Sequence, residues 1–190
     1  MATVVASELC LACGLCCRGV LHPDAILDED EIAKANRLEL TVGVNSAGND
    51  VFALPCRHHD HDHNACTIYD DRFHVCRRYT CDLLSLLLAD GITLEDARGI
   101  AETTRAVESK VYAHLGGYDP TTSIWRRISE HAAALEHEAS EDQQRRADFL
   151  LNARLLSLLC HRHFEARHHK RLNATASASA SRGDTEREST

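Results

Sequence analysis

Apolar residues recur at helical spacing over most of the second half of the chain. The clearest stripe consists of small or apolar residues three or four positions apart: Leu94, Ala97, Ala101, Thr104, Val107, Val111 and Leu115. Thr93, with Glu95 and Asp96 in the following turn, is typical of a capped helix start, and Gly116–Gly117 would end the helix. Stripes of this kind form helix–helix interfaces, so the pattern predicts a helical C-terminal region.

Three further helices are predicted in the same region. A short one covers residues 83–88, and the next follows Pro120 with a stripe on one face: Ile124, Trp125, Ile128, Ala132 and Leu135. The capping-box pattern at 140–143 opens the last helix, which is predicted to bury four leucines: Leu151, Leu155, Leu158 and Leu159. Cys160 beside them is expected to be a small core residue. The histidines near its end suit the negative end of a helix dipole: His161, His163, His168 and His169.

The first half of the chain is less regular. Residues 28–40 begin with acidic positions and place Ile32, Ala35 and Leu38 on one face, which predicts a short helix. Short β-prone runs on either side of Asn45–Asn49 predict a hairpin. The fold class is therefore expected to be mainly α, with an irregular cysteine-rich metal-binding module (residues 8–82) packed against a helical region (residues 83–171). The tail, residues 172–190, has almost no large apolar residue and is expected to be disordered.

Charge and hydropathy narrow the function classes. A net charge of −8 disfavours a general nucleic-acid binder, which needs a basic face to displace counterions. The first ten residues lack the basic start and the longer apolar stretch of a secretory signal. No apolar run approaches the ~20 residues that cross a bilayer. We therefore expect a soluble, cytoplasmic protein with neither nucleic acid nor membrane as its partner.

Cysteine clustering is the strongest chemical signal. Of nine cysteines, eight lie in the first 81 residues, in two groups of four: Cys10, Cys13, Cys16 and Cys17, then Cys56, Cys66, Cys76 and Cys81. Cytosolic thiols are kept reduced, so such groups are more often metal ligands than disulfides. A C-x2-C turn brings two thiolates to one ion, and a third cysteine in register exceeds what a redox pair needs. Four thiolates suit either a Zn²⁺ ion or an iron–sulfur cluster, and the sequence leaves both open.

The adjacency of Cys16 and Cys17 constrains how the thiols are shared. Consecutive side chains point to opposite faces of an extended chain and diverge by about 100° on a helix. Directing both sulfurs at one ion would strain the backbone by roughly 1–3 kcal/mol. We therefore expect three of the first four cysteines to share a centre with a cysteine from 56–81. The fourth is expected either to face a second centre or to lie beside the ligands as a thiol that does not bind the metal.

Other polar residues near the cysteines are less specific. Five arginines lie close in sequence to a cysteine: Arg18, Arg57, Arg72, Arg77 and Arg78. For each one, compensating the charge of thiolates and lying in solvent are equally good interpretations. Four histidines lie between Cys56 and Cys66, and a solvated polar loop is favoured over an additional metal site: His58, His59, His61 and His63. Tyr69 and Asp70 have no nucleophile beside them, which favours packing and turn roles over acid–base catalysis.

Two segments together resemble a known family. "CLACGLCC" (residues 10–17) and "CTIYDDRFHVCRRYTC" (residues 66–81) are similar to the two blocks of the YkgJ-type CxxCxxCC proteins, a zinc- or iron-chelating family. Phe73 stands where that family usually has proline. The resemblance covers about residues 8–82 and implies metal or iron–sulfur binding through these cysteines.

The same resemblance raises the question of catalysis. A similar cysteine block occurs in flagellin lysine methylases, but this chain has no glycine-rich nucleotide loop, so we do not expect that activity. The alternative to a binding protein is an iron–sulfur-dependent oxidoreductase or a protein-modifying enzyme acting at the cluster. Such an enzyme needs a substrate pocket with further polar groups, and no constellation of that kind is recognisable in the sequence. A binding function is therefore favoured.

Overall fold

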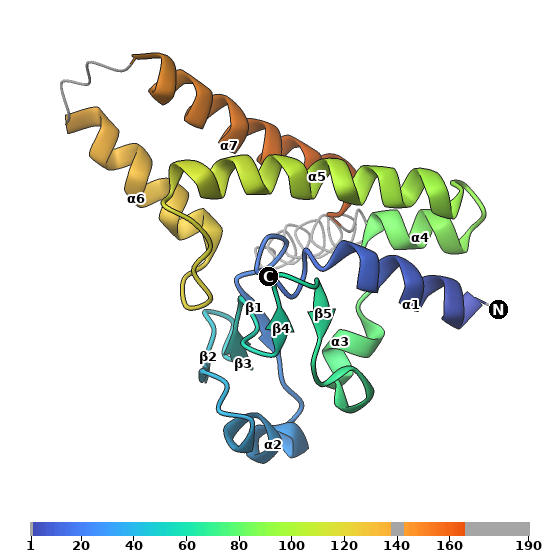
Figure 1. Ribbon diagram of the computed structural model, residues 1–190. Coiled ribbons are helices and arrows are strands. Elements are labelled where there is room, and N and C mark those ends of the chain that lie inside the picture. Colours follow the sequence, from blue (N-terminus) through green and yellow to red (C-terminus); the bar gives the residue numbers. More distant parts are fainter. Residues whose placement is uncertain (1, 138–142, 166–190) are drawn as a thin grey trace, which may run out of the picture.

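The computed structural model describes residues 2–137 and 143–165, and the mainly α prediction is confirmed (Figure 1). Two long helices, α5 and α7, lie side by side, and α1 and α4 pack against α5. α6 precedes α7 and contacts it. The bounds of the larger helices are α1 Ala2–Cys13, α4 Asp82–Leu88, α5 Leu94–His114, α6 Ile124–His137 and α7 Gln143–His163.

A smaller layer of strands and short helices lies on one side of the long helices (Figure 1). Its main sheet is antiparallel with strand order β1-β3-β2, and the β2–β3 pair confirms the predicted hairpin. The helix predicted over 28–40 is also present, as a 3-10 turn followed by α2. The bounds are β1 Asp24–Ile26, η1 Glu29–Glu31, α2 Ile32–Arg37, β2 Val42–Val44, β3 Asp50–Ala53, β4 His59–Asp60, β5 Ala65–Cys66, η2 Tyr69–Asp71 and α3 His74–Arg78.

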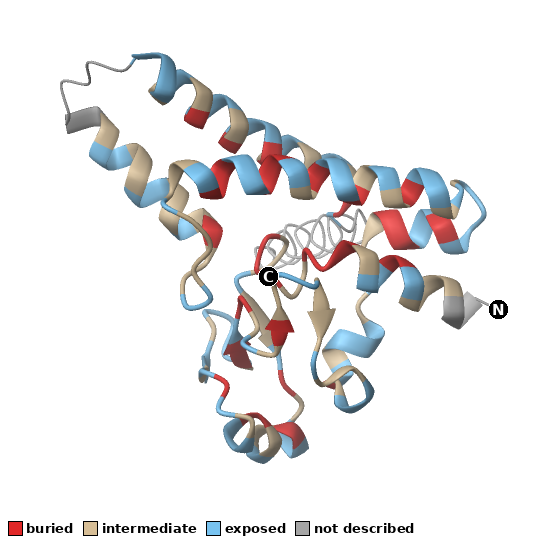
Figure 2. Ribbon diagram, viewed as in Figure 1, coloured by how far each residue is buried: buried red, intermediate tan, exposed pale blue. Residues whose placement is uncertain are grey.

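Two hydrophobic cores hold these layers. The larger one joins Leu9, Leu15 and Val20 to buried residues of α4, α5, α6 and α7, so residues on both sides of position 82 share it (Figure 2). The smaller one lies inside the strand layer, where the rings of Phe52 and Phe73 have centroids 5.0 Å apart. The CxxCxxCC segment therefore runs between the helical core and the strand layer.

Helix α5 follows its predicted pattern closely. The Thr93 hydroxyl accepts the Asp96 N–H at 3.1 Å, which is the expected N-cap. The buried face includes the predicted positions Ala97, Ala101, Thr104, Val107 and Val111. Both predictions are confirmed, because a single apolar stripe leaves only one face to bury.

The predicted core face of α7 is wrong. The helix buries Phe149, Ala153, Leu156 and Cys160, whereas Leu151, Leu155 and Leu158 are exposed and Leu159 is half-buried. Two stripes at helical spacing coexist on α7, and contact with α5 selects the one that carries the aromatic ring. Cys160 is a buried core residue, as expected. The capping-box positions 140–142, the histidines at 168 and 169 and the tail lie outside the described residues.

The two faces of α7 can be compared directly by alanine substitution. We expect Leu156→Ala, at a fully buried position, to lower the free energy of unfolding by about 2–5 kcal/mol. Leu151→Ala, whose side chain is 67% exposed, should change it by less than about 0.5 kcal/mol. Urea unfolding of the two variants measures the difference. Equal losses would contradict this choice of face.

Candidate metal centre

The first two cysteines lie on the last turn of α1. Cys10 and Cys13 are three residues apart in this helix, so their side chains share one side of it. The chain does not reverse within this C-x2-C, contrary to expectation. It turns at Gly14, whose φ is +67° and whose N–H donates to the Cys10 carbonyl at 3.0 Å. A Cβ at Gly14 would overlap the Asn64 side chain, and the positive φ itself disfavours any residue with a Cβ. Both facts favour glycine at this position.

Asn64 joins the second cysteine block to the end of α1. Its amide Nδ2 donates to the carbonyls of Leu11 at 2.7 Å and Ala12 at 3.0 Å. These carbonyls belong to the last turn of α1 and have no partner within the helix. No motif pointed to Asn64 in the sequence, because its function depends on a contact across more than fifty residues.

Backbone hydrogen bonds connect Cys17 of the first cysteine block with Cys56 and Cys66 of the second. The Cys56 N–H donates to the Cys17 carbonyl at 2.7 Å, and the His59 N–H donates to the Cys56 carbonyl at 3.0 Å. His59 in β4 then pairs with Cys66 in β5. Cys17, Cys56 and Cys66 are therefore connected by main-chain contacts, independently of any metal.

A first group consists of thiols that raise one another's pKa values, because neighbouring thiolates repel each other: Cys10, Cys13, Cys16 and Cys81. Burial raises the pKa of Cys16 well above its ordinary value, and Cys13 and Cys81 are the thiols that raise it most after burial. Burial also raises the pKa of Cys13 to about 12, with Cys81 and Cys10 adding to the effect. Burial is also the main cause that raises the pKa of Cys81, and Cys10 raises it further.

The remaining four thiols form a second group: Cys17, Cys56, Cys66 and Cys76. Burial is the main cause that raises the pKa of Cys17, and Cys56, Cys76 and Cys66 follow in that order. Burial raises the pKa of Cys56 to about 11, with contributions from Cys76 and Cys66. Cys16 and Cys17, adjacent in the chain, are therefore influenced most by different thiols, and the effects that Cys17 has on Cys16 and Cys10 has on Cys17 are smaller.

Backbone N–H groups and Arg72 act in the opposite direction and lower the pKa values of individual thiols. The N–H groups of Leu15 and His58 lower the pKa values of Cys13 and Cys56, and the Leu84 N–H donates to the Cys81 sulfur at 3.4 Å. Such bonds favour a thiolate and tune a bound metal. Arg72 lowers the pKa of a thiol in each group, Cys10 and Cys76, against the larger effect of burial.

The arginines predicted to surround the cysteines have different partners. Of the five, Arg72 alone acts on the thiols in this way among the described residues. Arg18 pairs with Glu108, Arg57 with Glu39, and Arg77 donates to backbone carbonyls. Arg105 of α5, which the sequence did not single out, lowers the pKa of Cys13.

Arg72 is held by Tyr69 and lies beside the position where the family has proline. Its guanidinium lies 3.6 Å from the centre of the Tyr69 ring, and its Nε donates to the Tyr69 carbonyl at 2.8 Å. Tyr69 thus has the packing role expected of it. Phe73 has φ −64°, an angle that proline also adopts, so the substitution keeps the local turn and adds a buried ring.

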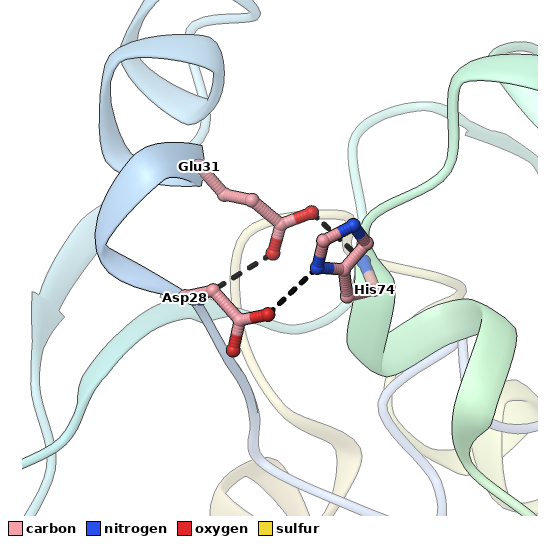
Figure 3. A group of neighbouring side chains, drawn as sticks. All are labelled: Asp28, Glu31 and His74. Carbon is pink, nitrogen blue, oxygen red and sulfur yellow. Dashed lines mark hydrogen bonds and ion pairs between the residues drawn. The ribbon is translucent and has the colours of Figure 1, made fainter.

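A carboxylate–imidazole cluster holds the helix that carries Cys76. Asp28, Glu31 and His74 are the one set of three potential ligand atoms within 4.8 Å of one another in the described residues (Figure 3). Glu31 accepts the N–H groups of His74 at 2.8 Å and Asp28 at 3.3 Å, and the His74 ring lies 2.7 Å from Asp28. These bonds account for all three side chains as a clamp on the first residue of α3.

The histidine segment is not the solvated loop that its composition predicts. His59 is 8% exposed, and neither ring nitrogen has a hydrogen-bond partner among the described residues. Burial, reinforced by Arg18, lowers its pKa to about 4. His61 stacks on Tyr118 at 3.9 Å, whereas His63 is exposed as predicted. The β4–β5 ribbon turns two histidines inward, which alternation alone could not show.

Comparisons with known proteins agree with this chemistry. The model of the CxxCxxCC family, described as a "putative zinc- or iron-chelating domain", matches residues 9–105, about half of the chain. The chain belongs to this family. No curated protein and no solved structure matches it. Family and thiols together support metal binding as the function class. Within the described residues, none of the helices is both long and apolar enough to cross a membrane.

Cys160 should differ from the eight clustered thiols in reactivity. Burial, followed by Glu108 and Glu165, raises its pKa to about 12 from an ordinary value of 9.0. A shift of this size lowers the thiolate fraction near pH 8 about a thousandfold, and the thiolate is the nucleophile. After chelation, N-ethylmaleimide should label the exposed Cys10 and leave Cys160 unlabelled until urea is added. Early labelling of Cys160 would contradict its core position.

Proposed function

We propose that this protein holds two metal centres, each bound by four thiolates. Centre 1 consists of Cys10, Cys13, Cys16 and Cys81, and centre 2 consists of Cys17, Cys56, Cys66 and Cys76. The observation that carries the proposal is the main-chain bond of Cys17 to Cys56, whose neighbour His59 pairs with Cys66, while Cys10 and Cys13 share one side of α1. The thiols that most affect the pKa values of Cys16 and Cys17 divide in the same way. Each resulting group has the four sulfurs that a closed thiolate site requires.

The surroundings of the sulfurs fit a metal better than free thiols. Burial raises the pKa values of seven clustered thiols, which are therefore protonated near neutral pH in the absence of a metal: Cys10, Cys13, Cys16, Cys17, Cys56, Cys76 and Cys81. A metal ion or cluster replaces these protons and removes the repulsion among thiolates. The N–H groups directed at Cys13, Cys56 and Cys81 stabilise the charge that remains. A reducing compartment such as the cytoplasm would keep the ligands available.

Sulfur spacing favours iron–sulfur clusters over single zinc ions. Four sulfurs about 2.3 Å from one zinc lie only about 3.8 Å from one another in a tetrahedron. In the described residues, no three cysteine sulfurs lie within 4.8 Å of one another. A cluster has several irons, and its thiolates are correspondingly further apart. When bound, such clusters transfer single electrons, so the function we propose is that of a one-electron carrier.

Anaerobic purification with a visible spectrum and elemental analysis tests the choice of metal. A brown protein with iron and acid-labile sulfide is the expected result. A colourless protein containing about two zinc ions would overturn the iron–sulfur assignment and leave the two thiolate centres in place.

Serine substitution of the two adjacent cysteines tests the two-centre arrangement. We expect Cys16→Ser and Cys17→Ser each to lose about half of the bound metal, because each removes a ligand from one centre of two. Maleimide labelling with peptide mass spectrometry should then find the partners of the removed ligand reactive, and these differ between the variants. Cys160→Ser is the control and should retain all metal. The same set of reactive thiols in both variants would refute the division.

A further inference from the structure

Helix α5 lies beside α1 (Figure 1), and three of its polar side chains contact residues in or next to the CxxCxxCC segment. Arg98 pairs with Glu8 at 2.6 Å, and Arg105 donates to the Ala12 carbonyl at 2.7 Å. Further along α5, Glu108 accepts from Arg18. The first pair is partly exposed, and the other two contacts involve residues immediately before Cys13 and immediately after Cys17.

The Arg18–Glu108 pair is fully enclosed. Arg18 is 4% exposed and Glu108 0%, and the Arg18 Nε lies 3.0 and 2.9 Å from the two Glu108 oxygens. The other side of the guanidinium lies 2.6 Å from His61 Nε2, which must accept because arginine only donates. A buried pair of this kind adds little net stability but fixes geometry strongly, since one partner alone is left as a buried charge.

Arg105 acts at the other end of the same segment. The Ala12 carbonyl is in the last turn of α1, where helical carbonyls lack internal partners. Arg105 and Asn64 share that carbonyl, and together they fix the direction in which the chain leaves α1 toward Cys13 and Gly14. Arg105 and Glu108 are three residues apart, so both project from one side of α5.

We propose that Arg105 and Glu108 are positioning residues, each responsible for a different metal centre. Arg105 holds the Cys13 end of the segment, and therefore centre 1. Glu108 holds Arg18, and through it Cys17, a ligand of centre 2. The inference rests on the two-centre function proposed above and adds that α5 fixes the centres separately. Any partner or change that shifts α5 would then act on both.

Metal retention in the loaded, full-length protein tests this. The variants are challenged with a chelator, and N-ethylmaleimide labelling of each cysteine is followed by peptide mass spectrometry. Glu108→Gln should speed labelling of the centre 2 thiols about 10–100-fold, the usual effect of losing an outer hydrogen-bond partner. Arg105→Met should do the same for the centre 1 thiols. Arg98→Met, which removes the exposed pair on the same helix, is the matched control and should change neither.

A double variant separates positioning from general stability. Arg18→Met with Glu108→Leu replaces the buried pair by apolar groups, which is expected to restore the thermal stability that Glu108→Gln loses. Centre 2 thiols should still be labelled faster, because the directional bonds are gone. The inference is overturned if both single variants release the two groups equally, or if the double variant restores metal retention together with stability. If all eight thiols of the unsubstituted protein are released as one group, the two-centre function fails instead.

Discussion

Two adjacent side chains cannot direct their sulfurs to the same point without strain, and the arrangement around Cys16 and Cys17 follows from this constraint. Among the thiols, Cys13 at the end of α1 and Cys81 at the start of α4 have the largest effects on the pKa of Cys16. The Cys17 carbonyl accepts the N–H of Cys56, which precedes β4, and Cys56, Cys76 and Cys66 have the largest effects among the thiols on the pKa of Cys17.

Burial of the clustered thiols disfavours their ionisation, whereas metal binding requires it. Crowded, buried thiols resist ionisation, as the raised pKa values of Cys13 and Cys56 indicate, yet metal ligands must be ionised. N–H groups of Leu15 and His58 and the cation of Arg72 favour the thiolate. Their effects are smaller than that of burial, so in the proposed centres a metal would supply most of the compensating charge. This imbalance is the physical link between the fold and metal binding.

Polar side chains also hold the segments that carry the cysteines in place. α5 is buried along one stripe that includes Glu108, and Glu108 and the neighbouring Arg105 contact the cysteine segment. The clamp of Glu31 on His74 has an equivalent function for Cys76 on the opposite side. Short elements such as α3 have too little helix of their own to be stable, so these polar contacts set the position of Cys76.

Local pattern in the sequence was sufficient for some of this structure. The α5 stripe and its Thr93 cap, the β2–β3 hairpin and the family itself follow from spacing, because each depends on residues close in the chain. The adjacency of Cys16 and Cys17 led to the prediction that they serve different centres, which the proposed experiments test. Only the tertiary structure chose the buried face of α7, where two apolar stripes compete and contact with α5 decides. It also buried His59 and paired Arg18 with Glu108, ninety residues away, because no local rule encodes a contact between distant segments.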